Sequence, residues 1–302
     1  MKNILPFLWF DNQAEEAVNF YVSTFSTVLD SSAGEKKSSE LYTNRYGEAG
    51  PGPKGSVMIM GFQLIGQEFS ALNGGPVKDF TFNPSISFFV DCKNEEELSE
   101  LFKKLSYSGK IRMPLDKYPF SERFAWIDDK FGVSWQLNLA KNNYDIIPFL
   151  WFDNQAEEAM NYYTSIFSAI GANDSGIKKL TRFGKNDNGP VGKVKHAVFT
   201  LNGQQYMAMD SNKENFSPAI SLFVNCDTQK EVDELWNKLS QGGKTSQCGW
   251  LTDKFGITWQ IIPTILGKLI SDLDHNKSQR VVQAMLKMTK IESKILIEAY
   301  EQ

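Results

Sequence analysis

The stretch ILPFLWFDNQAEEA at residues 4–17 returns almost unchanged as IIPFLWFDNQAEEA at residues 146–159. The duplication continues along the chain in three further pairs: FNPSISFFVDC (82–92) with FSPAISLFVNC (216–226), NEEELSELFKKLSYSGK (94–110) with TQKEVDELWNKLSQGGK (228–244), and AWIDDKFGVSWQL (125–137) with GWLTDKFGITWQI (249–261). A repeat of this length is a whole domain rather than a solenoid unit. We therefore predict two copies of one domain, residues 1–141 and 142–263, followed by a tail at residues 264–302.

The composition is that of a globular protein that can build a proper core, with 302 residues of which 41% are hydrophobic and 23% charged. A net charge of −4 gives no broad attraction to nucleic acid or to an anionic membrane. No apolar run approaches the roughly 20 residues of a spanning helix. The N-terminal residues lack the pattern of a signal peptide, so we expect a cytoplasmic protein. The three cysteines, Cys92, Cys226 and Cys248, are too scattered for a disulfide framework or a zinc knuckle.

Local patterns alternate in type within each copy. ILPFLWF is a continuous apolar run, typical of a strand buried on both faces, and Pro6 favours an early or edge position. AEEAVNFYVSTF carries apolar residues at helical spacing. VMIMGFQLIGQEFSAL (57–72) predicts a hairpin turning near Gly66, and SISFFVDC, NEEELSELFKKL and FGVSWQL predict a strand, a helix and a closing strand. Each copy is therefore two βαβββ modules.

This order predicts an α+β fold of four βαβββ modules, in which helices cover one face of two curved sheets and the other faces form cups. The first copy is longer than the second, and we place its extra residues in loops near 47–55 and 113–122, which are rich in turn formers. The tail carries SQRVVQAMLKMTKIESKILIEAY, with apolar residues at helical spacing. We interpret it as a helical brace across the two domains, with a partner-binding helix as the alternative.

The segments PFLWFDNQAEEA, LNGQQYMAMD, CGWLTDKFGITWQIIP and QRVVQAMLKMTKI resemble one known family. They are similar to the PhnB-like branch of the vicinal oxygen chelate superfamily, whose members often carry the label "3-demethylubiquinone-9 3-methyltransferase" and which includes glyoxalase and bleomycin-resistance proteins. The resemblance implies tandem glyoxalase-like domains whose paired modules form ligand-binding cups. Single-domain relatives usually pair as dimers, so it also implies an intrachain pseudo-dimer, with a homodimer of the chain as an open alternative.

The resemblance also bears on metal binding. Metal-dependent members of the superfamily hold a divalent ion with His and Glu side chains inside the cup. Their ligand positions fall here on residues of other types: Gln136 and Gln260 on the closing strands, Pro6 and Pro148 on the first strands, and the neighbourhood of Ser85 and Ala219 on the fifth. A neutral amide is a weak ligand for zinc or nickel, and proline has no donor. We therefore expect no metal.

Seven residues are candidates for ligand binding: Trp9, Gln136, Trp151, His196, Cys248, Trp250 and Gln260. The tryptophans recur at equivalent places in the two copies, although packing in the core is the alternative for each. Along FGVSWQLN the two-residue period puts Gln136 on the face opposite Trp135, and the polar face suits a cup wall. His196 could contact a ligand or be structural. The thiol of Cys248 could be nucleophilic, although inert buried cysteines are commoner.

Methyl transfer finds no support in the motifs. No G-x-G-x-x-G stands between a strand and a helix, as a common S-adenosylmethionine site requires, so we expect no cofactor. The leading hypothesis is a metal-free protein that binds an unidentified small molecule in its cups. A metal-dependent lyase, isomerase or dioxygenase is the first alternative, and a methyltransferase is the second. Whether the chain is an enzyme stays open at this point.

Overall fold

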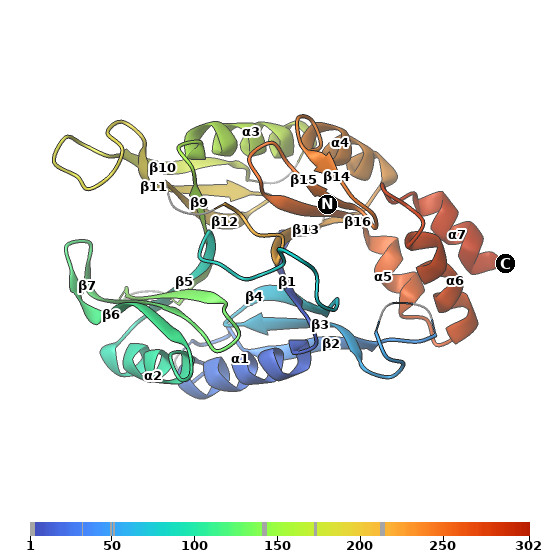
Figure 1. The fold of residues 1–302 in the computed structure, drawn as a ribbon, viewed down its shortest axis with the longest axis horizontal. Coiled ribbons are helices and arrows are strands. Elements are labelled where there is room, and N and C mark those ends of the chain that lie inside the picture. The colour runs from blue at the N-terminus through green and yellow to red at the C-terminus, as the bar shows by residue number, and fades with distance from the viewer. Residues whose placement is uncertain are drawn as a thin grey trace.

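A computed structural model describes residues 4–31, 33–48, 50, 52–140, 144–171, 174–211 and 215–302. The strands form two eight-stranded sheets, which lie side by side between two layers of helices (Figure 1). Sheet A comprises β1 (Ile4–Phe10), β2 (Ser39–Arg45), β3 (Val57–Leu64), β4 (Gln67–Asn73), β13 (Ile220–Cys226), β14 (Lys244–Thr245), β15 (Trp250–Thr252) and β16 (Thr258–Pro263). Sheet B comprises β5 (Ile86–Cys92), β6 (Lys110–Tyr118), β7 (Ser121–Asp128), β8 (Ser134–Leu139), β9 (Ile146–Phe152), β10 (Gly176–Arg182), β11 (Val194–Leu201) and β12 (Gln204–Asp210).

Each sheet combines one module from each sequence copy. The order is β14-β15-β16-β13-β1-β4-β3-β2 in sheet A and β10-β11-β12-β9-β5-β8-β7-β6 in sheet B. The copies meet where β1 pairs antiparallel with β13, and where β5 pairs antiparallel with β9. The predicted α+β fold of four βαβββ modules and two curved sheets is confirmed. Pro6 lies near the start of β1, which is a central strand of sheet A, so of the two predicted positions the edge is wrong.

Helices cover the outer faces of the sheets, as Figure 1 shows. They are α1 (Ala14–Leu29), α2 (Glu95–Leu105), α3 (Ala156–Ala169) and α4 (Gln229–Leu239), and the tail adds α5 (Thr264–Ile270), α6 (His275–Met285) and α7 (Ser293–Glu301). In α1 the buried residues recur at helical spacing, and the rings of Tyr21 and Phe25 each lie 5.4 Å from the ring of Trp135. Among the described residues, no helix combines the length and the hydropathy needed to cross a membrane.

The two copies differ most in the hairpin that precedes the closing strand. In the first copy residues 113–122 lie within the long hairpin β6–β7, so the prediction of a loop there is wrong. Register shifts in this hairpin interrupt the regular ladder and accommodate Pro114. The described residues of the other extra segment, 47–55, lie in turns between β2 and β3, whereas residues 49 and 51 lie outside the described part. In the second copy the hairpin is reduced to β14 and β15, which have only 2 and 3 residues.

The C-terminal tail occupies the space beside this short hairpin. The backbone N–H groups of Cys248 and Gly249 donate to the carbonyl oxygens of Met288 and Thr289, each at 2.8 Å. At the opposite edge of sheet A, on β2, the Asn44 side-chain amide donates to Ser271 Oγ at 3.3 Å. The tail therefore touches strands from both copies, as the brace interpretation predicts, and it lies across the open side of sheet A (Figure 1).

Candidate functional site

A cavity of about 1060 Å³ lies between the concave face of sheet A and the tail. We call it the chamber. Its lining includes Phe7, Trp9, Tyr42, Phe80, Phe223, Cys248, Trp250 and Gln260 from sheet A and its loops, and Leu266, Ile270, Val282, Met285 and Leu286 from the tail. Four of the seven predicted ligand-binding residues, Trp9, Cys248, Trp250 and Gln260, thus belong to one cavity. Because the sheet is shared, Trp9 comes from the first copy and the other three come from the second.

Aromatic rings from both copies meet on this concave face. The rings of Trp9 and Trp250 lie 5.6 Å apart and nearly perpendicular, at 83°. Phe80 packs edge-on against Trp9 at 4.9 Å, and Phe7 packs edge-on against Trp250 at 5.9 Å. The Trp9 indole N–H donates to the Gly75 carbonyl at 2.9 Å, which fixes the orientation of the ring.

Gln260 lies on the concave face, and its tryptophan neighbour lies on the helix face. The Gln260 amide donates to Ser221 Oγ at 2.9 Å, whereas Trp259 packs against Tyr163 of α3 at 5.3 Å. The same arrangement recurs in sheet B, where the Gln136 amide donates to Ser87 Oγ at 2.8 Å. The two-residue period therefore predicted the facing of both glutamines correctly.

Tyr42 is a lining residue that sequence reasoning missed. Its ring lies across Gly61, where an added Cβ would come within 2.1 Å of Tyr42 Cε1, and its hydroxyl is 3.2 Å from Ser70 Oγ. Burial raises the pKa of the Tyr42 phenol, so it stays protonated at neutral pH. The segment SELYTNR has little in common with its counterpart GIKKLTR, so the repeat gave no signal for this position.

Cys248 is placed in the chamber but not activated. Its backbone has a φ of 60°, a left-handed conformation that is uncommon for a side-chain-bearing residue. Its thiol points toward the Met285 carbonyl, with Sγ at 3.8 Å from that oxygen. Burial raises the pKa of the Cys248 thiol above its ordinary value, so the thiolate that a nucleophile needs is disfavoured.

The other three predicted residues lie on the concave face of sheet B. The Trp151 ring stacks on Trp126 at 4.8 Å, and the His196 ring lies 6.0 Å from the ring of Phe149. Burial, with a further contribution from the charge of Lys179, lowers the pKa of His196, so its imidazole is neutral at pH 7. The seven predicted residues thus form two separate groups.

The two concave faces also differ in charge. In sheet B the Arg112 guanidinium binds the carboxylate of Asp128 at 2.7 Å and lies 5.7 Å from the Trp126 ring. The residue equivalent to Asp128 in sheet A is Thr252, which pairs with Thr258 as Asp128 pairs with Ser134. Sheet A therefore has an uncharged hydroxyl where sheet B has an ion pair.

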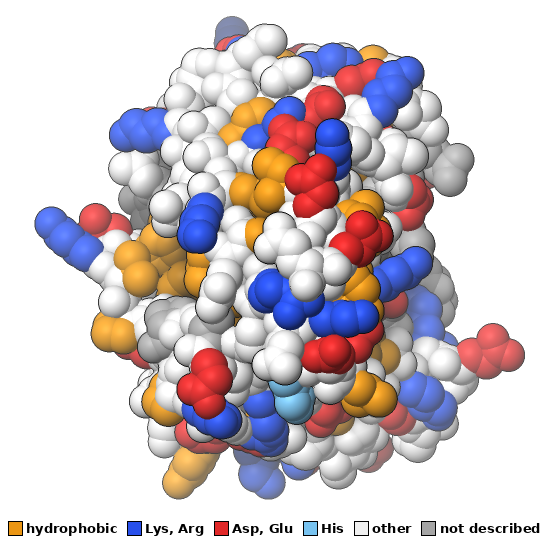
Figure 2. Space-filling view, turned by 90° about the vertical axis from the view of Figure 1, so that its right-hand side faces the viewer, with side chains coloured by type: hydrophobic (Ala, Val, Ile, Leu, Met, Phe, Trp, Pro, Cys, Tyr) orange, Lys and Arg blue, Asp and Glu red, His pale blue; other side chains and the backbone are white. Residues whose placement is uncertain are grey.

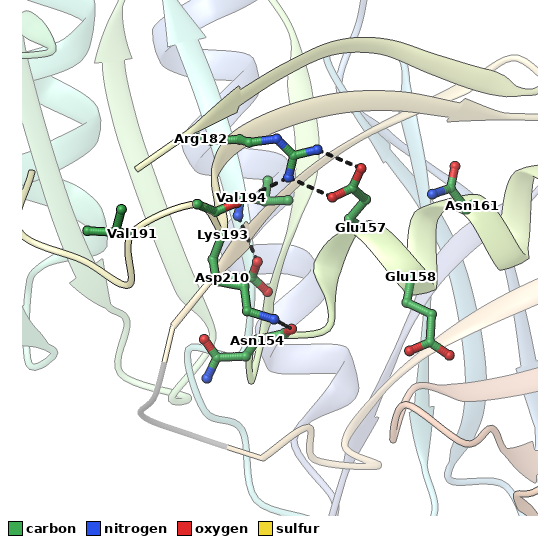
Figure 3. Close-up of a pocket in the computed structure, with 10 residues that line it drawn as sticks. Asn154, Glu157, Glu158, Asn161, Arg182, Val191, Lys193, Val194 and Asp210 are labelled. Atoms are coloured by element: carbon green, nitrogen blue, oxygen red, sulfur yellow. Dashed lines mark hydrogen bonds and ion pairs between the residues drawn. The ribbon is translucent and has the colours of Figure 1, made fainter. Parts of the chain in front are cut away.

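A second depression, of about 590 Å³, lies outside the cups at the start of α3 (Figure 3). Its charged groups are already paired, because Arg182 binds both carboxylate oxygens of Glu157 at 2.6 and 2.7 Å. Asp210 accepts from the backbone N–H groups of Ala156 and Val194, each at 2.8 Å. The first copy has the equivalent ion pair, between Arg45 and Glu15 at 3.1 Å. We interpret the ion pair in this depression as a structural link between β10 and α3.

The donor groups of the chamber do not fit a tightly held divalent metal. Gln260 lies on the closing strand, at the position of a metal ligand in metal-dependent relatives. Its amide N–H donates to the Ser221 hydroxyl, and a neutral amide is a weak ligand for a divalent cation. Among the described residues, no group of three or more His, Cys, Asp or Glu side chains converges on one point. The strand-to-helix turns at residues 11–13, 93–94, 153–155 and 227–228 read DNQ, KN, DNQ and DT, so they also lack the glycines of a dinucleotide-type or S-adenosylmethionine-type turn.

Comparison with known proteins gives a family match over most of the chain. The family model described as 3-demethylubiquinone-9 3-methyltransferase matches residues 2–138 and again residues 144–262. Protein YjdN of Escherichia coli (strain K12) is 24% identical over 139 residues, which are 45% of this chain and 94% of YjdN.

Solved structures resemble either one copy or the whole chain. The PhnB protein from Bacillus cereus, described with the same methyltransferase label, is 45% identical over 46% of this chain and 100% of its own, with a TM-score of 0.41. Glyoxalase I from Zea mays is 9% identical and covers 85% of this chain and 91% of its own, with a TM-score of 0.56. The likeness to glyoxalase I supports the tandem fold alone.

Proposed function

Since the chain belongs to the 3-demethylubiquinone-9 3-methyltransferase family, a PhnB-like branch of the vicinal oxygen chelate superfamily, we propose that it binds a small, partly aromatic molecule in the chamber without a metal ion. The observation that carries this proposal is the chamber itself, about 1060 Å³ of space walled mainly by aromatic and aliphatic side chains, with a few uncharged polar groups and the charged residues Glu68, Lys244 and Lys268. Such a cavity is the usual form of a small-molecule site.

The mouth of the chamber supports the same conclusion. Leu41 and Tyr42 line it and are 45% and 46% exposed, and Val77 and Leu286 line it with similar exposure. Exposed apolar side chains that gather around a cavity mark a surface that is covered when a ligand binds.

Equivalent residues in the two sheets provide a matched test. Prodan, a neutral naphthalene fluorophore whose emission shifts to the blue in an apolar site, serves as the probe. We expect prodan to bind the wild-type protein, and Trp250→Ala and Gln260→Ala to weaken binding by about tenfold, the size of one lost contact group. Trp126→Ala and Gln136→Ala are the controls in sheet B, and they should leave the affinity unchanged. Equal effects of both pairs would contradict a site in the chamber.

The absence of a metal is tested on the purified protein. Native mass spectrometry beside the denatured mass, with elemental analysis of the same sample, should give a mass without zinc, nickel, manganese or iron. A stoichiometric metal would make the lyase, isomerase or dioxygenase alternative the leading one. An organic adduct that survives in the native spectrum would identify the ligand class directly.

Methyl transfer is the activity that the family description names. We expect no heat on isothermal titration with S-adenosylmethionine, because the strand-to-helix turns lack the glycine-rich element that cradles such a cofactor. Saturable heat with one-to-one stoichiometry would restore the methyltransferase hypothesis.

A further inference from the structure

We propose that the ligand of the chamber is an organic anion, whose acidic group lies at the rim in the field of Lys244 and Lys268 and whose apolar part enters the interior. The proposal deepens the function proposed above and rests on it. It follows from the charges of the lining, which the second copy and the tail supply.

Lys244 lacks the acidic residue that faces its counterpart in the other sheet. In sheet B, Lys110 pairs in register with Asp128, whose carboxylate also binds the guanidinium of Arg112 at 2.7 Å. In sheet A, Lys244 pairs in register with Thr252. Residues directly opposite on antiparallel strands project to the same face. The lysine therefore faces a carboxylate in sheet B and a neutral hydroxyl in sheet A.

Lys268 adds a second cation, which comes from the tail. It lies on α5, lines the chamber and is exposed, as Lys244 is. Among the residues that the structure describes, neither lysine has an ion-pair partner. An anionic ligand can therefore pair with these ammonium groups without displacing a carboxylate of the protein.

Glu68 limits where the acidic group can lie, because it is the one acid in the described part of the lining. It lies on β4, and four strands of sheet A separate β4 from β14, which carries Lys244. Burial and, to a smaller extent, the charge of Glu68 raise the pKa of Tyr42, which places this carboxylate near the Tyr42 phenol. An anionic group is therefore repelled on the β4 side of the chamber and attracted on the β14 side.

The surroundings of the chamber offer no general attraction to anions. The chain has a net charge of −4, and the surface on the side of the tail carries charged side chains of both signs (Figure 2). The interior is lined mainly by aromatic and aliphatic side chains, where an ionised group would lose its hydration without a partner. The acidic group therefore stays at the rim, where water and the lysines both reach it.

The test uses two probes of nearly the same shape that differ in charge. 2-Naphthoate is ionised at pH 7 and 2-naphthamide is neutral, and each is titrated against bound prodan at low ionic strength. An exposed ion pair raises affinity by up to about fivefold, so the two lysines together should make naphthoate bind about tenfold more tightly than naphthamide. Lys244→Gln and Lys268→Gln should each reduce this preference by about threefold. Added salt should lower the preference of the wild type toward that of the double variant.

The controls are lysines outside the chamber. Lys110→Gln changes the equivalent position in sheet B, and Lys287→Gln changes an exposed residue of the tail that does not line the chamber. Both should leave the preference for naphthoate unchanged. Thr252→Asp supplies the carboxylate that is absent opposite Lys244, so it should reduce the preference by about threefold, as Lys244→Gln does.

The outcomes separate this inference from the proposed function. If naphthoate binds no more tightly than naphthamide, or if its preference survives in the double variant, the lysines do not select the ligand and the inference is wrong. A preference that Lys110→Gln reduces equally would also contradict it, because the anion would then lie elsewhere. Prodan binding that still depends on Trp250 would in these cases leave the proposed function intact. If neither prodan nor either naphthalene probe binds, the proposed function is overturned, and the inference with it.

Discussion

The hydroxyl of Tyr163 donates a hydrogen bond of 2.7 Å to Asp253 Oδ2, and the same pair recurs in the first copy as Tyr21 and Asp129 at 2.8 Å. Each carboxylate also accepts from the indole N–H of the tryptophan on the closing strand, which is Trp259 for Asp253 at 2.8 Å. The aspartate thus joins the first helix of one module to the closing strand of another. It holds the tryptophan on the helix face, and the next residue, a glutamine, then faces the cup.

Removing the hydroxyl of Tyr163 should destabilise the fold. Tyr163→Phe leaves the buried Asp253 with one donor fewer, and a hydrogen bond to a charged group contributes about 1.5–3 kcal/mol. We expect the free energy of unfolding, measured in urea, to fall by about that amount. Tyr107→Phe is the control, because Tyr107 is 75% exposed and should give no change. A Tyr163→Phe protein as stable as the wild type would show that the pair contributes little.

The buried carboxyl of Asp129 makes stability depend on pH. Burial raises its pKa to about 6, although Trp135, Tyr21 and two backbone N–H groups counteract this by hydrogen bonding. A folded-state pKa above the unfolded value of about 3.9 means that the folded protein holds the proton more tightly. The resulting stabilisation is fully present below about pH 4 and is lost as the pH rises through about 6.

The measurement compares the wild type with Asp129→Asn, which cannot titrate at this position. Between about pH 7 and pH 5 the unfolding free energy of the wild type should rise by about 1–1.5 kcal/mol relative to the variant. A difference that stays constant over this range, or that falls toward pH 5, would contradict a raised pKa.

Tyr206 offers a substitution that should stabilise the protein. Its hydroxyl is buried and, among the described residues, has no hydrogen-bond partner, whereas the equivalent position of the first copy is Phe69. Burying an unpaired hydroxyl costs about 1–3 kcal/mol, so Tyr206→Phe should raise the free energy of unfolding by up to that amount. Tyr206→Phe and Tyr163→Phe remove the same atom and should have opposite signs. Destabilisation by Tyr206→Phe would reveal a partner for this hydroxyl.

The rate at which Cys248 reacts with a thiol reagent reports how accessible the chamber is. Cys92 and Cys226 are buried and Cys248 is partly exposed, so in the native protein Ellman's reagent should modify Cys248 alone. Because burial raises the pKa of Cys248, the reaction should be slower at neutral pH than that of a free thiol and should accelerate as the pH rises. Bound prodan should slow it further. Cys248→Ser should abolish the native reaction, and a fast reaction near pH 7 would indicate an activated thiolate instead.

Much of the fold could be predicted because local patterns are sufficient for it. The apolar run at β1, the helical spacing of α1 and the alternation at β8 each identify an element without knowledge of its partners. The pairing of β1 with β13 could not be predicted in this way, because it joins segments more than half the chain apart. Pro6 shows the consequence, since a residue typical of strand edges lies at the centre of sheet A, where the two copies meet.

Three of the four chamber residues that the sequence predicted lie at positions where the two copies agree, and Cys248 is the exception. Trp9, Trp250 and Gln260 were found because equivalent residues recur in the other copy. Tyr42 lies on a strand whose sequence differs between the copies. The aliphatic residues that the tail contributes to the chamber lie in a segment that has no counterpart in the first copy. The repeat also could not show that candidates from different copies would share one cavity, because that depends on how the modules are exchanged between the sheets.

The single tail has a consequence for how such a protein can change. In a symmetric dimer of identical chains, any extension or substitution is present at both sites, so one site cannot be altered without the other. Here both cups belong to one polypeptide, and the tail lines the cavity at sheet A. Joining the two halves into one chain therefore allows each cup to change independently, and here the tail occupies the space beside the short hairpin of the second copy.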